Sequence, residues 1–181
     1  MLDPRITKLA EHLLSEGKVK RPPIPVSKLA TLSGATIRSG PLPMELSGFL
    51  VRRGKSTILG VNSLHARQRQ RFTIAHEIGH LLLHPHNDHV DRGISFYFRN
   101  ERSSQAEVRG EIEANQFAAD LLMPKSMIDD LMLKPVDLMD EAAVGTLAST
   151  FDVSAQALTY RLTNLGLAPH LLRRPTRIKR P

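Results

Sequence analysis

Cysteine and tryptophan are absent from the 181-residue chain, and aromatic residues make up only 4% of it. Without cysteine no disulfide framework can form, so any metal site must be built from His, Asp and Glu. No apolar run approaches the ~20 residues that span a bilayer, and the N-terminus lacks the basic-then-apolar order of a signal peptide. We therefore expect a cytoplasmic protein that makes no membrane contact.

Acidic residues are missing from the last twelve positions, and this absence explains most of the net charge of +7. The five basic residues of that segment leave only about +2 for residues 1–169. We predict a basic, disordered tail over 169–181, which could contribute weak phosphate contacts to a nucleic acid. Nothing in the sequence indicates an oligomeric state. The basic residues of the tail are Arg173, Arg174, Arg177, Lys179 and Arg180.

The first third of the chain predicts helices around a small sheet. Asp3 is placed to cap a helix that ends at Gly17, and a shorter helix ends at Gly34. A strand follows, and residues 46–63 predict two strands joined as a hairpin. These patterns favour an α+β fold, with a small twisted sheet over 35–62 and helices surrounding it.

The remaining chain is predicted to be mostly helical. A long helix is expected from Asn62 or Ser63, either of which can cap it, to Pro85. A polar loop follows, with a short strand at 94–98, and then a second long helix over 106–123.

The string "RFTIAHEIGHLLLH", at 71–84, contains His-Glu-x-x-His. On a helix His76 and His80 lie one above the other, so both imidazoles can bind one ion. Glu77 lies about 100° round the helix, where it can reach a metal-bound water rather than the metal. This pattern is typical of zinc peptidases, and the apolar residues around it predict a mostly buried site.

A third ligand is expected from the second long helix. Its apolar stripe runs through Ala114 and Leu121, and Glu111 lies about 60° from the centre of that stripe. Glu113 lies about 100° away on the other side, so Glu111 is favoured, although Glu113 stays an alternative. Asn115, one turn beyond Glu111, could orient a histidine ring by a hydrogen bond.

Other histidines and acids near the motif are less suitable as ligands. His84 lies eight residues after His76, which is about 12 Å along the helix axis and too far for a shared tetrahedral ion. The residues after the helix are predicted to be solvated in a loop: His86, Asp88, His89 and Asp91.

These motifs together resemble the ImmA/IrrE family of metallo-endopeptidases. The resemblance rests on "RFTIAHEIGHLLLH", on "EIEANQFAADLLMP" and on "LASTFDVSAQALTYRLTNLGL", and it covers roughly residues 25–168. It implies a gluzincin-type site, in which His76, His80 and Glu111 bind one Zn²⁺ per chain and Glu77 is the catalytic acid/base. Mn²⁺ is also accepted by such a ligand set.

The resemblance also implies a partner, because members of the family cleave a helix-turn-helix repressor and so derepress stress or mobile-element genes. In the expected reaction Glu77 takes a proton from the attacking water and gives it to the leaving amine. The oxyanion needs a further donor, for which Tyr97 is the first candidate and His84 or His89 the others.

The C-terminal part predicts a helix, a short turn and a second helix capped by Ser154, which is the layout of a helix-turn-helix. Only Gln156, Arg161 and Asn164 of the second helix suit DNA reading, so a packing or substrate-docking role is favoured. The rival hypothesis is a non-cleaving, DNA-binding regulator or antitoxin-like partner that keeps the peptidase fold. We expect a peptidase domain over 1–134 and this helical segment over 135–168.

Overall fold

Helix α1 (Pro4–Glu16) opens the fold, and the Asp3 side chain accepts a hydrogen bond from the Arg5 N–H, as predicted. Helix α2 (Val26–Leu32) follows, and Gly34, with φ of +85°, turns the chain into the first strand. The computed structural model describes residues 2–54, 56–85, 89–91, 105–132 and 137–167.

A four-stranded mixed sheet contains β1 (Ala35–Gly40), β2 (Gly48–Arg53), β3 (Ser56–Asn62) and β4 (His89–Asp91). The strand order is β1-β3-β2-β4. The hairpin predicted over 46–63 is confirmed, because β2 pairs antiparallel with β3. β1 is parallel to β3, and β4 is antiparallel to β2. The predicted α+β class is therefore correct.

The Asn62 side chain fixes the corner after β3. Its Oδ1 accepts from the N–H groups of Leu42 and Leu64, each at 3.1 Å. Its Nδ2 donates to the carbonyl oxygens of Leu42, Pro43 and Leu46. The expected capping role of Asn62 or Ser63 is wrong, because the amide of Asn62 is used to hold the 42–46 loop.

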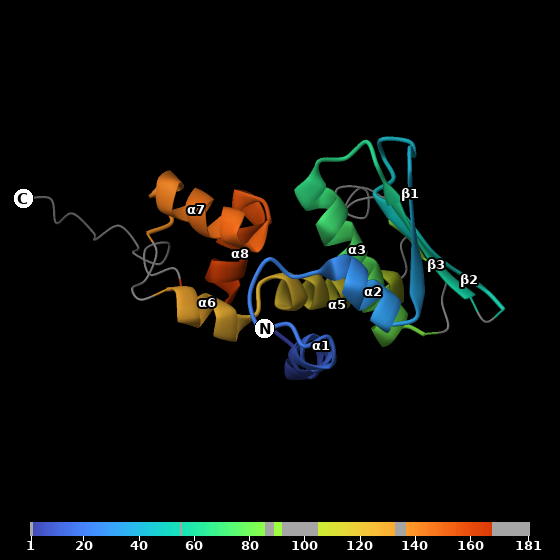
Figure 1. Cartoon of the computed structure of the whole chain (residues 1–181), viewed down its shortest axis with the longest axis horizontal. Helices are drawn as coiled ribbons and strands as arrows, with labels where there is room; N and C mark the ends of the chain where they lie inside the picture. The colour runs from blue at the N-terminus through green and yellow to red at the C-terminus, as the bar shows by residue number, and fades with distance from the viewer. Residues whose placement is uncertain (1, 55, 86–88, 92–104, 133–136, 168–181) are drawn as a thin grey trace, which may run out of the picture.

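Helix α3 (Arg67–Leu83) begins after Ala66, several residues later than expected and without a side-chain cap. Helix α5 (Gln105–Leu122) packs across it and also against α1. Figure 1 shows α3 and α5 in the middle of the molecule, with the sheet on one side and the C-terminal helices on the other. The predicted apolar stripe of α5 is fully buried: Ala114, Phe117, Ala118, Leu121 and Leu122.

Three further helices complete the described chain: α6 (Lys125–Leu131), α7 (Glu141–Phe151) and α8 (Ala155–Asn164). Asp152, in the left-handed conformation with φ of 54°, ends α7. Ser154 caps α8 by accepting from the Ala157 N–H at 3.2 Å, as predicted. Asp152 also binds α3, because its Oδ2 lies 2.7 Å from Arg67 Nη2 and its carbonyl accepts from Arg71 Nε.

Arg161 of α8 points into the protein rather than to solvent. Its Nη1 lies 2.5 Å from Asp120 Oδ1 of α5, and its Nε donates to the Met123 carbonyl. Both charged residues are almost fully buried. Burial lowers the pKa of Arg161, and the neighbouring Asp120 carboxylate partly opposes that shift. Arg161 is therefore unable to read DNA in this arrangement, contrary to one of the roles considered for it.

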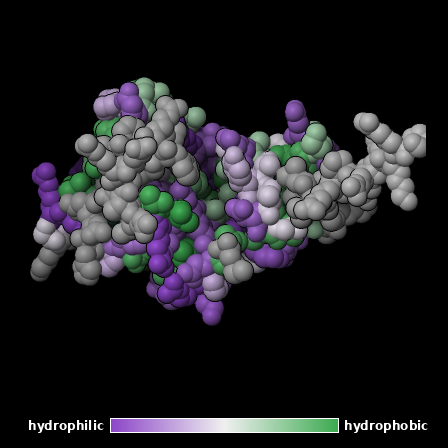
Figure 2. All heavy atoms as spheres, turned by 180° about the vertical axis from the view of Figure 1, so that it is seen from behind, coloured by the Kyte–Doolittle hydropathy of each residue, from purple (hydrophilic) through white to green (hydrophobic). Residues whose placement is uncertain are grey.

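β4 was not predicted, because three residues of a polar segment carry too little pattern to indicate a strand. The short strand expected at 94–98 lies outside the described residues. Among the described helices, none is long and apolar enough to cross a membrane. On the face shown in Figure 2, hydrophobic residues form small patches interrupted by hydrophilic ones.

Candidate metal centre

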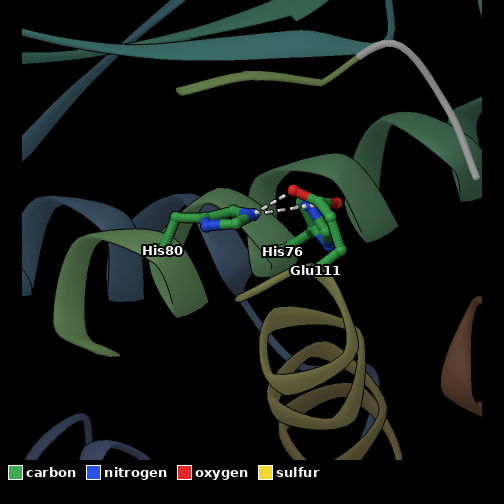
Figure 3. Close-up of side chains that lie close together, drawn as sticks. All are labelled: His76, His80 and Glu111. Atoms are coloured by element: carbon green, nitrogen blue, oxygen red, sulfur yellow. Dashed lines mark hydrogen bonds and ion pairs between the residues drawn. The ribbon is translucent and has the colours of Figure 1, made fainter. Parts of the chain in front are cut away.

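Three side chains from two helices converge on one point. The Nε2 atoms of His76 and His80, both on α3, lie 3.0 Å apart. Glu111 of α5 places Oε2 3.3 Å from His76 Nε2 and Oε1 3.1 Å from His80 Nε2. Figure 3 shows the three side chains pointing toward one another between the helices. Their exposed fractions are 2%, 5% and 9%, so water contributes little to their solvation.

The spacing of these donor atoms suits a tetrahedral divalent ion. Two ligand atoms each ~2.0–2.1 Å from such an ion stand roughly 3.3 Å apart. The donor set of two imidazoles and one carboxylate is also the type found at catalytic zinc. Within the part of the chain that the structure describes, this is the group of His and acidic residues that could hold a metal ion.

Asn115 orients one of the histidines. Its Oδ1 lies 3.0 Å from His76 Nδ1. An amide oxygen can only accept, so the Nδ1 of His76 carries the proton and its Nε2 presents a lone pair toward the centre. The hydrogen bond expected between Asn115 and a histidine ring is therefore present, and it selects the tautomer that a metal ligand needs.

Glu77 is fully buried beside the histidines. β2 approaches α3 closely here because position 48 is glycine. A Cβ on Gly48 would stand 2.5 Å from Thr73 Cγ2, 2.6 Å from the Gly60 carbonyl oxygen and 3.6 Å from Glu77 Oε1. The Glu77 carboxylate thus lies between α3 and the start of β2, in surroundings where a charge is poorly solvated.

Gly79 allows the two ligand-bearing helices to touch. A Cβ at this position would stand 3.1 Å from Ala114 Cα and 3.2 Å from Phe117 Cδ1. Ala114 lies three residues after Glu111, so the contact sets the depth at which the carboxylate reaches the histidines. No local sequence signal indicates this role of Gly79, because a helix–helix contact depends on a partner far along the chain.

Glu113 faces away from the centre. Its Oε1 accepts from Arg109 Nε at 2.8 Å, and its Oε2 lies 3.6 Å from His84 Nε2. The His84 ring centroid is 5.6 Å from that of His80, and His84 is not part of the converging group. The structure therefore brings together Glu111 rather than Glu113 with the two histidines.

The expected oxyanion donor, Tyr97, lies outside the described residues. The backbone of His89 belongs to β4, which packs against α3 and crosses the view above the three side chains in Figure 3. His86 and Asp88 also lie outside the described residues.

Comparison with known proteins supports a family assignment. Residues 34–163 match the family model described as the IrrE N-terminal-like domain. Two relatives bear the name radiation response metalloprotease IrrE. The one from Deinococcus deserti is 35% identical over 114 residues, which are 62% of this chain and 38% of that protein. The one from Deinococcus radiodurans is 31% identical over 145 residues, which are 79% of this chain and 41% of that protein.

The chain thus spans about two fifths of the length of these relatives. The uncharacterized immunity region protein 2 of Bacillus phage phi105 is 27% identical over 114 residues, covering 63% of this chain and 65% of that protein. A solved structure described as a Mycobacterium tuberculosis transcriptional regulator superposes with a TM-score of 0.62 at 19% identity. It covers 97% of this chain and 49% of that one, and it supports the fold alone.

Proposed function

Because the chain belongs to the ImmA/IrrE family, we propose that it is a metal-dependent endopeptidase that hydrolyses a peptide bond in a protein substrate. The observation that carries the proposal is the convergence of His76, His80 and Glu111 at mutual distances of 3.0–3.3 Å. A protein that keeps the fold but has lost peptidase activity would not need the buried Glu77 beside these residues, whereas a peptidase needs this carboxylate as a base.

His76, His80 and Glu111 would hold one Zn²⁺ per chain, and Mn²⁺ is accepted by the same donors. When bound, such an ion supplies Lewis acidity and lowers the pKa of a coordinated water. Asn115 keeps the His76 ring in the orientation and tautomer that the ion requires.

Glu77 moves protons in this proposal. Its carboxylate accepts a proton from the attacking water and delivers it to the nitrogen of the leaving amine, so that the peptide bond breaks into an acid and an amine. The burial of Glu77 supports the role, because it keeps the carboxylate beside the two histidines and away from bulk solvent. Tyr97 stays a proposed oxyanion donor.

We propose a helix-turn-helix repressor as the substrate, cleavage of which would derepress stress or mobile-element genes. The relatives named for a radiation response and for an immunity region support this choice. We further propose that residues 1–134 form the peptidase domain and that residues 135–168 dock the substrate.

The rival, a DNA-binding regulator that does not cleave, loses support from α8. Arg161 is the only cationic residue of that helix, and it is buried against Asp120. α8 still exposes Gln156 and Asn164, but it presents no cation for a phosphate, and phosphate contacts are what position a helix on DNA. Weak nucleic-acid contact through the basic tail stays a separate prediction, because the tail lies outside the described residues.

The proposal is tested by Glu77→Gln. The amide keeps the shape of the side chain but cannot accept the proton, so metal content should stay unchanged while cleavage falls at least ~100-fold. Wild type and variant, loaded with Zn²⁺ or Mn²⁺, are incubated with candidate helix-turn-helix repressors from the same genome, those of neighbouring genes first, and the products are resolved on a gel. Glu113→Gln makes the same chemical change at an acid outside the metal group, and this variant should cleave the repressor as fast as wild type does. A Glu77→Gln protein that relieves repression as well as wild type, with the repressor intact, would leave a binding regulator in place of the peptidase.

A further inference from the structure

Arg69 lies on the same face of α3 as the metal group. It precedes His76 by seven residues, which turn the helix through about 700° and bring Arg69 within about 20° of His76. Seven residues also separate the two by about 10.5 Å along the axis. Arg69 therefore stands two turns from the centre, on the surface of α3 that carries the ligands.

The Arg69 side chain is positioned by the start of β2. Its Nη2 donates to Ser47 Oγ at 2.9 Å, and Ser47 is buried. The next residue, Gly48, lies against Thr73 and Glu77. The guanidinium is thus held between the start of β2 and α3, farther along α3 from the metal group than the proposed base Glu77. Arg69 itself is exposed.

The charge of Arg69 is not neutralised by a carboxylate in the described part of the chain. Two other arginines of α3, Arg67 and Arg71, both pair with Asp152. Arg69 makes no ion pair with Glu45, the acid of the neighbouring loop. The bond to Ser47 uses one of the five N–H groups of the guanidinium, which leaves donors for a further partner.

A bound peptide would follow the line from the metal group to Arg69. β2 runs alongside α3, because Gly48 lies at Thr73 and Arg52 Nη2 reaches the His84 carbonyl at 3.3 Å. Extended peptides commonly add to an exposed sheet edge. β4, which is antiparallel to β2, is the edge strand on this side of the described sheet. At about 3.3 Å per residue, the 10.5 Å between His76 and Arg69 correspond to about three residues of an extended chain.

We propose that Arg69 is a specificity-determining residue that selects an Asp or Glu of the substrate about three residues from the scissile bond. The guanidinium fork matches a carboxylate in a paired, charge-assisted contact, which neutral side chains cannot reproduce. This inference rests on the proposed peptidase function and adds to it a preference for acidic sequences.

The test compares cleavage preferences. Zn²⁺-loaded wild type, Arg69→Gln and Arg69→Glu are incubated with a chymotryptic digest of a bacterial proteome, and the new ends are sequenced by mass spectrometry. We expect wild type to favour acidic over amide residues about three positions from the bond by ~10-fold or more, the scale of one hydrogen bond to a charge. Arg69→Gln should lose that preference, and Arg69→Glu should favour Lys or Arg there. Arg38→Gln removes the same charge from an exposed position of β1, at the far edge of the described sheet from β4, and should keep the wild-type preference.

If only the intact repressor is cut, the same comparison is made on acid-to-amide variants of the repressor around its mapped cleavage site. Equal preferences in wild type and Arg69→Glu would overturn the role of Arg69 while leaving the peptidase intact. Wild type that cuts neither the peptides nor the repressor would overturn the proposed function, and the inference with it.

Discussion

Single side chains define the chemistry of the centre. His76 has a fixed tautomer because Asn115 accepts from its Nδ1. Glu111 contacts both histidines, whereas Glu113, two residues later, is bound to Arg109. Two acids of one helix thus have different roles, which follow from the face that each occupies.

Glu111→Gln should sharply reduce the metal content of the purified protein, because a neutral amide is a poorer ligand than a carboxylate. Glu113→Gln should leave it at about one ion per chain. Both variants are loaded with Zn²⁺, dialysed and measured by atomic absorption. Loss of metal from Glu113→Gln alone would show that Glu113, and not Glu111, is the third ligand.

Asn115→Ala should weaken metal binding by ~10–100-fold, the usual effect of removing the group that orients a histidine ligand. The fold should persist, because the side chain is only partly buried. Affinity is measured by competition with a zinc-binding dye. A variant with wild-type affinity would mean that the hydrogen bond to His76 has no part in holding the ion.

The chemistry of the centre was more predictable from the sequence than its supports. Helical spacing predicted that His76 and His80 share one face of their helix, that Glu111 lies near the apolar stripe of the second helix, and that Asn115 follows Glu111 by one turn. The ion pair between Asp120 and Arg161 could not be foreseen, because it joins two helices whose relative placement no local pattern describes. For the same reason, the sequence alone allowed Arg161 to be an exposed, DNA-reading residue.

At the scale of elements, the crossing of α3 and α5 positions the ligands. Gly79 lies against Ala114, so the helix axes approach closely at this point. Local signals predicted the caps Asp3 and Ser154 and the β2–β3 hairpin. They did not reveal the parallel pairing of β1 with β3, since a strand's partner depends on contacts far along the chain.

Gly79→Ala should weaken metal binding several-fold. The added methyl would stand 3.3 Å from the Ala114 carbonyl oxygen, so α5 must shift and carry Glu111 with it. Overpacking should lower the free energy of unfolding by about 1–3 kcal/mol, which outweighs the gain of about 0.5–1 kcal/mol from better helix propensity. Metal affinity and thermal unfolding are measured together.

Gly145→Ala provides the matched control, because a Cβ at this position of α7 would meet nothing within 4 Å. It should raise the free energy of unfolding by about 0.5–1 kcal/mol without changing metal affinity. If both variants bind metal as wild type does, the helix crossing does not set the ligand geometry.

Across the whole molecule, two charged contacts attach the C-terminal helices to the body. Asp152 binds Arg67 and Arg71 of α3. Arg161 binds Asp120, whose other oxygen accepts from Thr7 Oγ1 of α1 at 2.8 Å. α8 is therefore connected through α5 to the first helix of the chain.

Removing one partner of the buried pair of Asp120 and Arg161 should destabilise the fold. Asp120→Asn or Arg161→Met leaves a buried charge without its counter-ion and should lower the free energy of unfolding by about 3–5 kcal/mol. Asp120→Leu combined with Arg161→Met removes both charges and should unfold closer to wild type. Urea denaturation of the single and double variants checks this, and a double variant as unstable as the sum of its parts would show that the charges do not act as a pair.

The metal group draws its three donors from two separate helices, so a chain in which α3 and α5 have come apart cannot bind the ion with the same affinity. Ion binding at this group would consequently be linked to folding. Each tenfold rise in free metal above the dissociation constant should add about 1.4 kcal/mol to the free energy of unfolding. A chelator should lower the melting temperature of the wild type more than that of Glu111→Gln. In a cell, the fraction of this protein that survives proteolysis would then vary with the supply of the ion, and metal availability would regulate the amount of the protein as well as its proposed activity.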